Sequence, residues 1–427
     1  MIARPRSLAT LLVSLGIAGP SSAAPLDWPQ FRGPTGQGMV SLERGPLPTQ
    51  WGPNSTVVWR AELPGRGWSS PVVDQKGVIY VTSAVAEGEA DAPAEARREL
   101  RVLAISGETG VIVWEKTVFT QGGPTQSKIH KKNSHASPTP VLAGNVIFVH
   151  FGHQGTACLR TKDGSIIWQN NSISYAPVHG NGGSPLLVGD QLIFSCDGAR
   201  NPFVLSLDGR TGRIRWKRDR QTTAKRTFSF STPILVTQGG KSEVILPGSG
   251  NLFAYDPRSG RELWRCPWGE GYSVVPRPVF GHGLIFASSG YDRPVLYAVP
   301  PGGQGTVSAE WTFTGKGVPR NSSFCLVGEA LFTIDDKGIG SCLNAMTGEL
   351  LWQERILSDT SASLLAQGNS LYATDELGTT VVYQASSEGY APIAENRLNE
   401  RTLASLAVIE NDILQRTETT LYRLGQN

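Results

Sequence analysis

Closely spaced cysteines are missing from this chain of 427 residues. Its five cysteines lie far apart at Cys158, Cys196, Cys266, Cys325 and Cys342, and no C-C, C-x-x-C or C-x-x-C-H sequence occurs. These absences exclude the usual zinc-knuckle spacings and covalent haem attachment. We expect the thiols to be buried as small apolar groups, because an odd number of cysteines cannot pair completely within one chain.

Familiar catalytic signatures are also missing. The sequence contains no G-x-S-x-G elbow, no H-E-x-x-H pair and no phosphate-binding P-loop. The six histidines lie in loops and strands without a diagnostic metal-ligand spacing, so we predict neither a metal site nor a catalytic residue. A net charge of +3 is too small to indicate nucleic-acid binding.

Long apolar runs are absent except near the start of the chain. Residues 8–18 are apolar, follow Arg4 and Arg6, and precede the small residues "SSAA". This order predicts a signal peptide over residues 1–23, cleaved near Ala23. The run is too short to span a bilayer comfortably. We therefore expect a periplasmic or secreted protein with no transmembrane span.

What the chain does have is a repeated phrase in which a glycine-containing turn precedes a strand with tryptophan. It occurs as "ISGETGVIVW", "RTKDGSIIW", "LDGRTGRIRW", "YDPRSGRELW" and "NAMTGELLW". Short strands starting at "SSPVV", "SPTPV", "SPLLV", "STPIL", "RPVFG", "SFCLV", "SLLAQ" and "LASLAV" divide the chain into eight units. Units of about 50 residues with four strands each predict an eight-bladed β-propeller. The tryptophans are interpreted as packing residues between blades.

The sequence also predicts how the ring closes. The last unit supplies three strands and then ends, while residues 55–63 near the N-terminus contain Trp59 at the place expected for an outer strand. We predict that this strand completes the last blade. The domain organisation is then a strap over 24–54, which Trp28 and Phe31 attach to the propeller surface, and a propeller over 55–427. The unit at 361–395 lacks its tryptophan.

These phrases resemble the PQQ-like propeller repeat. The segments "DWPQFRGPTGQG", "NSHASPTP" and "RTETTLYRLG" are similar to those of exported bacterial PQQ-like repeat proteins. A resemblance to BamB-type propellers implies a scaffold in outer-membrane β-barrel assembly that binds no quinone. A resemblance to quinoprotein dehydrogenases implies an enzyme that oxidises alcohols or sugars with pyrroloquinoline quinone and Ca²⁺.

The chain departs from both groups. It lacks the vicinal cysteines and long insertions of the dehydrogenases, and it lacks the lipoprotein cysteine of BamB. Few acidic residues stand where Ca²⁺ would need them. We therefore predict a monomeric binding or scaffold module without an assigned cofactor. The alternative is a quinoprotein dehydrogenase whose quinone, itself a tricarboxylate, is held by basic residues.

The candidate site follows from strand order. The long connectors fall on one face of the propeller, and long loops on a rigid scaffold usually carry function. An insertion at 85–99 on this face is interpreted as a flap. We predict a site for an anionic small molecule, a glycan or a protein partner. Its residues are His135, Asn181, Arg226, Arg277, Arg320, Asn321 and Arg401, with Trp68, Phe230 and Thr360 at equivalent positions. The competing interpretation is a solvated rim whose charges are paired with neighbouring acids.

Overall fold

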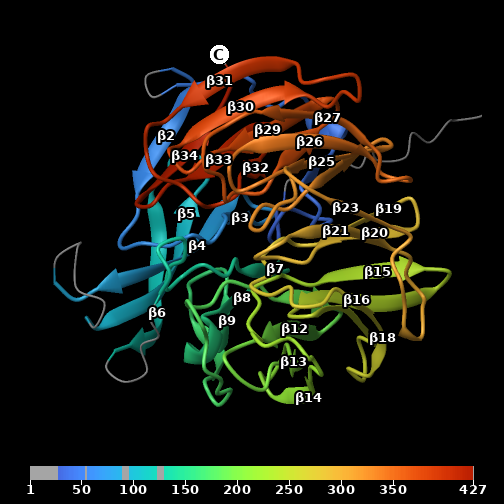
Figure 1. Ribbon diagram of the computed structural model, residues 1–427. Coiled ribbons are helices and arrows are strands. Elements are labelled where there is room, and N and C mark those ends of the chain that lie inside the picture. The colour runs from blue at the N-terminus through green and yellow to red at the C-terminus, as the bar shows by residue number, and fades with distance from the viewer. Residues whose placement is uncertain (1–26, 53–54, 89–95, 123–128, 427) are drawn as a thin grey trace, which may run out of the picture.

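Eight small sheets follow one another around a central axis, as a computed structural model of this protein shows (Figure 1). The structure describes residues 27–52, 55–88, 96–122 and 129–426. The colours pass around the ring in chain order, so that the first and last blades are neighbours. The predicted eight-bladed, all-β propeller is confirmed. The predicted signal peptide lies outside the described residues, and among these no helix is long and apolar enough to cross a membrane.

Each blade is an antiparallel sheet whose first strand is innermost. Blade 1 contains β3 (Val72–Val73), β4 (Val78–Ala86), β5 (Arg98–Ser106) and β6 (Ile112–Gln121). Blade 2 contains β7 (Val141–Ala143), β8 (Val146–His150), β9 (Thr156–Arg160) and β10 (Ile166–Asn170). Blade 3 contains β11 (Leu186–Val188), β12 (Gln191–Cys196), β13 (Phe203–Asp208) and β14 (Ile214–Asp219). Blade 4 contains β15 (Ile234–Gln238), β16 (Lys241–Gly248), β17 (Asn251–Tyr255) and β18 (Glu262–Pro267), with β22 (Gly305–Thr306) at its outer edge.

The second half of the ring repeats this plan. Blade 5 contains β19 (Val279–Gly281), β20 (Leu284–Ser288), β21 (Val295–Val299) and β23 (Trp311–Thr314). Blade 6 contains β24 (Cys325–Val327), β25 (Ala330–Ile334), β26 (Ile339–Asn344) and β27 (Leu350–Arg355). Blade 7 contains β28 (Leu365–Gln367), β29 (Ser370–Thr374), β30 (Thr379–Gln384) and β31 (Pro392–Arg397). Blade 8 contains β32 (Ala407–Ile409), β33 (Asp412–Arg416) and β34 (Thr420–Leu424). Among the described residues, two short 3-10 helices lie outside the blades, at Leu42–Arg44 and Gly152–Gln154.

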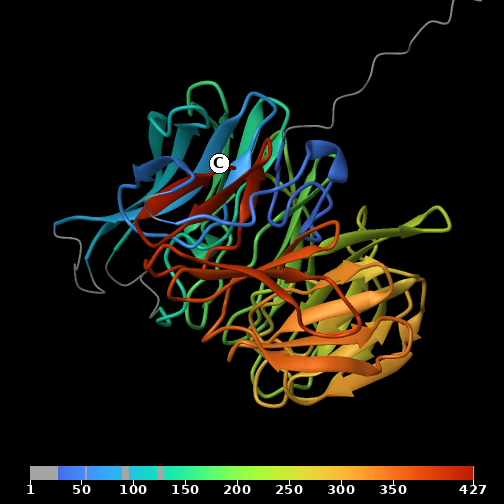
Figure 2. The ribbon, with the colours of Figure 1, turned by 90° about the horizontal axis from the view of Figure 1, so that it is seen from above.

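Strand β2 (Val57–Glu62) completes blade 8. It pairs antiparallel with β34, with Trp59 opposite Arg423. Figures 1 and 2 both show this blue strand beside the red C-terminal strands. The predicted closure by the N-terminal strand is therefore confirmed, because β2 covers the otherwise open edge of β34.

The repeated phrase now has a structural explanation, because its tryptophan docks on the following blade. The indole Nε1 of Trp114 donates to Thr161 O over 2.9 Å, and that of Trp168 donates to Gly209 O over 2.8 Å. The turn glycines have positive φ, and a Cβ added to them would collide with the tryptophan of the preceding blade. These glycines are Gly110, Gly164, Gly212, Gly260 and Gly348. One phrase thus serves two interfaces, with its glycine on one side of the blade and its tryptophan on the other.

The strap over residues 27–52 runs across one end of the central channel, and Trp28 lies where it contacts the propeller. Trp28 exchanges two backbone hydrogen bonds with Val73 on the innermost strand of blade 1. Pro29 O accepts from Leu142 N over 2.8 Å on blade 2. Strand β1 (Met39–Val40) then pairs parallel with β28, the innermost strand of blade 7. Phe280 N on blade 5, across the ring, donates to Gln37 Oε1 of the strap over 2.7 Å. Because its contacts reach blades 1, 2, 5 and 7, the strap closes the channel at that end.

Two further predictions concern the cysteines and the insertion over residues 85–99. All five cysteines are buried and unpaired, as predicted. The insertion interpreted as a flap over 85–99 extends a β-hairpin, since β4 runs to Ala86 and β5 begins at Arg98. Residues 89–95 of that segment lie outside the described residues.

Candidate functional site

The centre of the propeller contains a cavity of about 300 Å³, here called the cup. Phe31 of the strap lines it at one end, and connector residues such as His130 and Tyr272 line it at the other. Between these ends the wall comes from residues at the start of the inner strands. The strap therefore turns what would be an open channel into a cup that faces the long connectors. Long connectors and cup lie on the face that the sequence indicated.

Seven aromatic side chains, here called the collar, surround the connector end of the cup: Trp68, His130, His179, Phe228, Phe230, Tyr272 and Tyr291. Several of the rings contact one another edge to face. The ring centroids are 5.3 Å apart for His130 and His179, and 5.4 Å apart for Phe228 and Tyr272. Such contacts fix the ring orientations and leave an apolar surface toward the cavity.

Three of the predicted arginines lie behind the collar. The guanidinium carbon is 4.5 Å from the ring centroid of Tyr272 for Arg226 and 5.4 Å from that of Tyr291 for Arg320. Arg401 lies 5.1 Å from the centroid of Trp68. These are cation–π distances. The arginines therefore support the collar from behind.

Carboxylates balance two of these collar arginines. An oxygen of Asp292 lies 3.8 Å from Arg226, and one of Glu418 lies 3.4 Å from Arg401. Arg401 also donates to Lys131 O over 2.6 Å. This part of the site agrees with the competing interpretation of paired loop charges.

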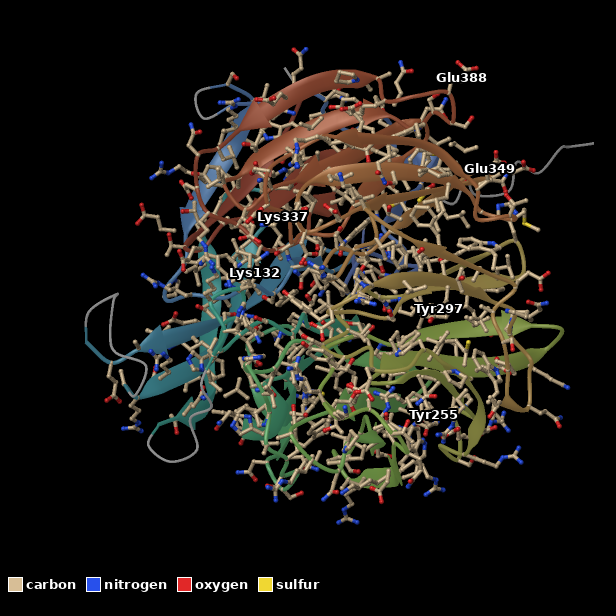
Figure 3. All side chains as sticks on the ribbon, in the orientation of Figure 1. Lys132, Tyr255, Tyr297, Lys337, Glu349 and Glu388 are labelled. Carbon is tan, nitrogen blue, oxygen red and sulfur yellow. The ribbon has the colours of Figure 1, made fainter. Side chains whose placement is uncertain are left out.

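Lys132, labelled in Figure 3, is the lysine that lines the cup. Its Nζ lies 2.7 Å from Glu376 Oε1. Burial alone would lower the pKa of Lys132, but the hydrogen bond and charge of Glu376 outweigh burial and raise it. Lys132 is therefore charged at neutral pH, with its charge balanced by Glu376 at the rim of the cup.

Below the collar, seven hydroxyl side chains form what we call the hydroxyl ring: Ser70, Thr139, Ser184, Thr232, Ser323, Ser363 and Ser405. Each occupies the same position before its inner strand. Hydrogen bonds connect them around the axis, because the backbone N–H of one member donates to the hydroxyl of the next blade. Ser70 N donates to Thr139 over 3.0 Å, and Thr139 N donates to Ser184 over 2.9 Å. The same contact joins Ser184 to Thr232, Ser323 to Ser363, and Ser363 to Ser405.

Arg277 occupies the eighth position of this ring. Its backbone N–H continues the pattern by donating to Ser323 over 2.9 Å. Its guanidinium donates to Phe31 O over 2.5 Å and to Gln30 Oε1 over 3.1 Å. The side chain is only 1% exposed, and burial together with the charge of Arg32 lowers its pKa to about 9. Arg277 therefore anchors the strap and does not line the cup.

The remaining predicted residues are spread over several places. Asn321 lines the cup, but its Nδ2 donates to Asp336 Oδ2 over 2.7 Å. His135 and Arg401 line a neighbouring cavity of about 560 Å³, where burial lowers the pKa of His135 to about 4. Asn181 accepts from the Tyr175 hydroxyl over 2.6 Å and stays outside the cup. The seven predicted residues do not form one cluster.

Sequence reasoning missed most of the collar and the whole hydroxyl ring. Phe228 and Tyr272 stand in two of the long connectors, where charged neighbours drew the interpretation toward an anion. The hydroxyl ring was visible as the Ser or Thr at the start of seven inner strands, with Arg277 in the eighth. Because Ser and Thr are common at strand starts, only the circular topology reveals that they converge.

The sequence matches the family described as outer membrane protein assembly factor BamB over residues 36–171 and 98–354, which together cover well over half of the chain. The chain belongs to this family of PQQ-like propellers. Among solved structures, BamB from Moraxella catarrhalis is similar with a TM-score of 0.60 and 16% identity, covering 87% of this chain and 99% of that one. A quinohemoprotein alcohol dehydrogenase from Pseudomonas putida is similar with a TM-score of 0.63 and 10% identity, covering 94% and 80%. At these identities the likeness shows the fold.

One curated relative of this chain is the quinoprotein ethanol dehydrogenase of Pseudomonas aeruginosa. It is 27% identical over 146 residues, which are 31% of this chain and 23% of that enzyme. The matched part thus spans about a quarter of the relative's length. Relatedness to both BamB and the quinoprotein dehydrogenases agrees with the resemblance seen in the sequence.

The described residues do not fit a calcium-bound quinone. Ca²⁺ in proteins takes about six to eight oxygen ligands with net negative charge. Within the described ranges no group of three or more His, Cys, Asp or Glu side chains is placed to hold a metal ion. The carboxylates nearest the cup are engaged, since Glu376 pairs with Lys132 and Asp336 accepts from Asn321. The cup offers hydroxyls and aromatic faces instead.

Proposed function

We propose that this PQQ-like propeller is a binding module, exported to the periplasm or secreted, whose ligand enters the cup from the connector face. The observation that carries the proposal is the combination of a closed floor at Phe31 and an aromatic collar at the mouth. A volume of about 300 Å³ lies at the lower end of the range for small-molecule sites. The cup thus suits a small molecule, or one side chain of a protein partner.

The collar defines what the outer part of the ligand should be. Its aromatic rings present faces and edges to the cavity, with arginines stacked behind Trp68, Tyr272 and Tyr291. A flat, largely apolar group would gain stacking and desolvation energy there. We therefore expect a ligand with a planar or hydrocarbon part in the collar.

A fluorescence titration of the mature chain with 2-naphthoate tests this function. Tyr272→Ala should weaken binding roughly fivefold, because one aromatic contact of about 1 kcal/mol is lost. Tyr297→Ala is the matched control, since this tyrosine of blade 5 packs on Trp268 away from the cup (Figure 3). Equal affinity of both variants and the wild type would place binding outside the collar and refute the proposal.

A further inference from the structure

The hydroxyl ring has unused hydrogen-bond donors. A Ser or Thr hydroxyl has one O–H donor and two acceptor positions. Six of the seven ring hydroxyls accept a backbone N–H, over 2.9–3.0 Å. In the hydrogen bonds of the described residues, none of the seven hydroxyls is a donor. Their protons are therefore available to a group on the axis of the cup. A remaining acceptor position on each oxygen means that donors alone do not decide between an anion and a cation.

The charge around the hydroxyl ring favours an anion over a cation. Three buried arginines border the hydroxyl ring, and none of them pairs with a carboxylate in the described structure. Arg277 is itself the eighth ring position. Arg416 donates to Ser69 O over 3.0 Å and to Ser69 Oγ over 2.6 Å, next to Ser70. Arg32 donates to Leu364 O over 3.2 Å, next to Ser363.

The positive charges of these guanidinium groups are buried, and several of their N–H groups lack hydrogen-bond partners in the described structure. Arg32, Arg277 and Arg416 are at most 2% exposed. The Nε and Nη1 atoms of Arg32, and the Nε and Nη2 atoms of Arg416, have no hydrogen-bond partner among the described residues. Burying a charge without an opposite charge is strongly unfavourable. An anion on the axis nearby would offset that cost.

These arginines carry charge at neutral pH. Burial lowers the pKa of Arg416 to about 9, and burial with the charge of Arg32 lowers that of Arg277 to about 9. Among the described residues that line the cup there is no Asp or Glu, and Glu376 and Asp336 contact Lys132 and Asn321 of the connectors. The potential at the level of the ring is therefore positive.

We propose that the hydroxyl ring is a receptor for one carboxylate or other small oxyanion, carried as the head group of the ligand that the cup binds. Uncharged O–H donors would contact the oxygens directly, and the three arginines would supply the charge from behind. This inference rests on the proposed function, because the ligand reaches the ring through the collar. It differs from the arginine cluster expected from the sequence, since Arg226, Arg320 and Arg401 lie behind the collar rings.

Calorimetric titrations of the mature chain at constant ionic strength test the ring. The probes are 2-naphthoate, its neutral isostere 2-naphthamide, and inorganic sulfate. We expect 2-naphthoate to bind with 1:1 stoichiometry and roughly tenfold or more tightly than 2-naphthamide, as for a hydrogen-bonded charged group. Sulfate should compete with 2-naphthoate if the ring takes free oxyanions as well as head groups. Sulfate that binds without displacing 2-naphthoate would contradict the proposal.

Thr139→Val removes one ring hydroxyl while keeping the shape of the side chain, and Thr139→Ser keeps the hydroxyl. The first should weaken 2-naphthoate binding about tenfold and leave 2-naphthamide unchanged, and the second should bind like the wild type. Ser70→Ala is a second variant for the case in which Thr139→Val fails to fold. In the described structure the Ser70 hydroxyl makes no hydrogen bond, so its loss should not affect folding.

The outcomes separate the two proposals. Equal affinities for 2-naphthoate and 2-naphthamide, with no competition by sulfate, would overturn the ring and leave the cup as a binding site. A third outcome is that Thr139→Val weakens sulfate binding while 2-naphthoate binds no more tightly than sulfate. This result would support the oxyanion site at the hydroxyl ring and refute ligand binding by the collar. No binding of any probe at millimolar concentration would refute both.

Discussion

The indole of Trp59 in the closing strand lies against Gly110 of blade 1, and its Nε1 donates to Gly107 O over 2.7 Å. Gly110 has a φ of 73°, and a Cβ added there would lie 2.8 Å from the indole. The same relationship joins Trp114 to Gly164 and Trp311 to Gly348. The glycine therefore has two functions, since it adopts a left-handed conformation and leaves room for the neighbouring tryptophan.

Gly110→Ala should lower the free energy of unfolding by about 2–4 kcal/mol, since backbone strain and a steric collision add together. Gly144→Ala is the control, because Gly144 also has a positive φ, of 56°, but no atom lies within 4 Å of an added Cβ. It should cost only about 1–2 kcal/mol from strain. Urea denaturation measures both. Equal losses of unfolding free energy in the two variants would show that the collision with Trp59 contributes nothing to the effect of Gly110→Ala.

Deleting residues 24–63 should abolish cooperative unfolding. The deletion removes β2, the outer strand of blade 8, together with the strap that contacts the innermost strands. Circular dichroism during thermal melting measures the effect. A truncated chain that melts as steeply as the full-length chain would contradict closure by the N-terminal strand.

Arg277→Met should release the strap. The change removes donors to Phe31 O, Gln30 Oε1 and Pro233 O. Amide hydrogen exchange at residues 28–38 should then become at least roughly tenfold faster, because local opening no longer breaks these bonds. Arg215→Met is the control, since that arginine pairs with Asp190 on the propeller exterior. Unchanged exchange in Arg277→Met would show that the strap is held by its other contacts.

His150 should contribute to acid destabilisation. Its side chain is buried, its Nδ1 lies 2.8 Å from Thr156 Oγ1, and burial lowers its pKa to about 3. Because the unfolded chain binds a proton near pH 6.5 and the folded chain does not, stability from this group is complete above pH 6.5. It falls by up to about 1.4 kcal/mol per pH unit as the pH drops from 6.5 toward 3.

Denaturation of His150→Gln at several pH values checks this contribution. The variant should have a shallower loss of stability between pH 6.5 and 4 than the wild type. His282→Gln is the comparison, because His282 is exposed in a turn. A His150→Gln profile parallel to that of the wild type would mean that other groups cause the acid dependence.

The architecture could be predicted from the sequence because it depends on short sequence patterns that recur along the chain. A turn glycine, a strand and a tryptophan recur at blade spacing, and the missing outer strand of blade 8 had a single replacement at Trp59. The course of the strap across the channel could not be predicted, because its contacts with Val73, Leu142 and β28 are far away in sequence. No local pattern in residues 28–40 reveals that Arg277 holds them across the channel.

For the candidate site, the sequence indicated only the face on which the long connectors lie. Strand order placed the long connectors on one face, but residue type did not show which side chains face the axis. Arg226, Arg320 and Arg401 suggested an open basic cluster, whereas they stack behind aromatic rings. The hydroxyl ring depends on hydrogen bonds between successive blades, and these exist only once the ring is closed.

The contact between Trp59 and Gly110 has a consequence for where the chain begins and ends. The N-terminal strand β2 and the C-terminal strand β34 pair within blade 8, and the seam between blade 8 and blade 1 uses the same glycine and tryptophan contact as seams elsewhere in the ring. As far as blade packing is concerned, the starting point of the chain is therefore arbitrary, and circular permutation at another connector should preserve the propeller. The strap is what distinguishes one starting point, because it precedes β2 of blade 8 and carries the groups that Arg277 binds.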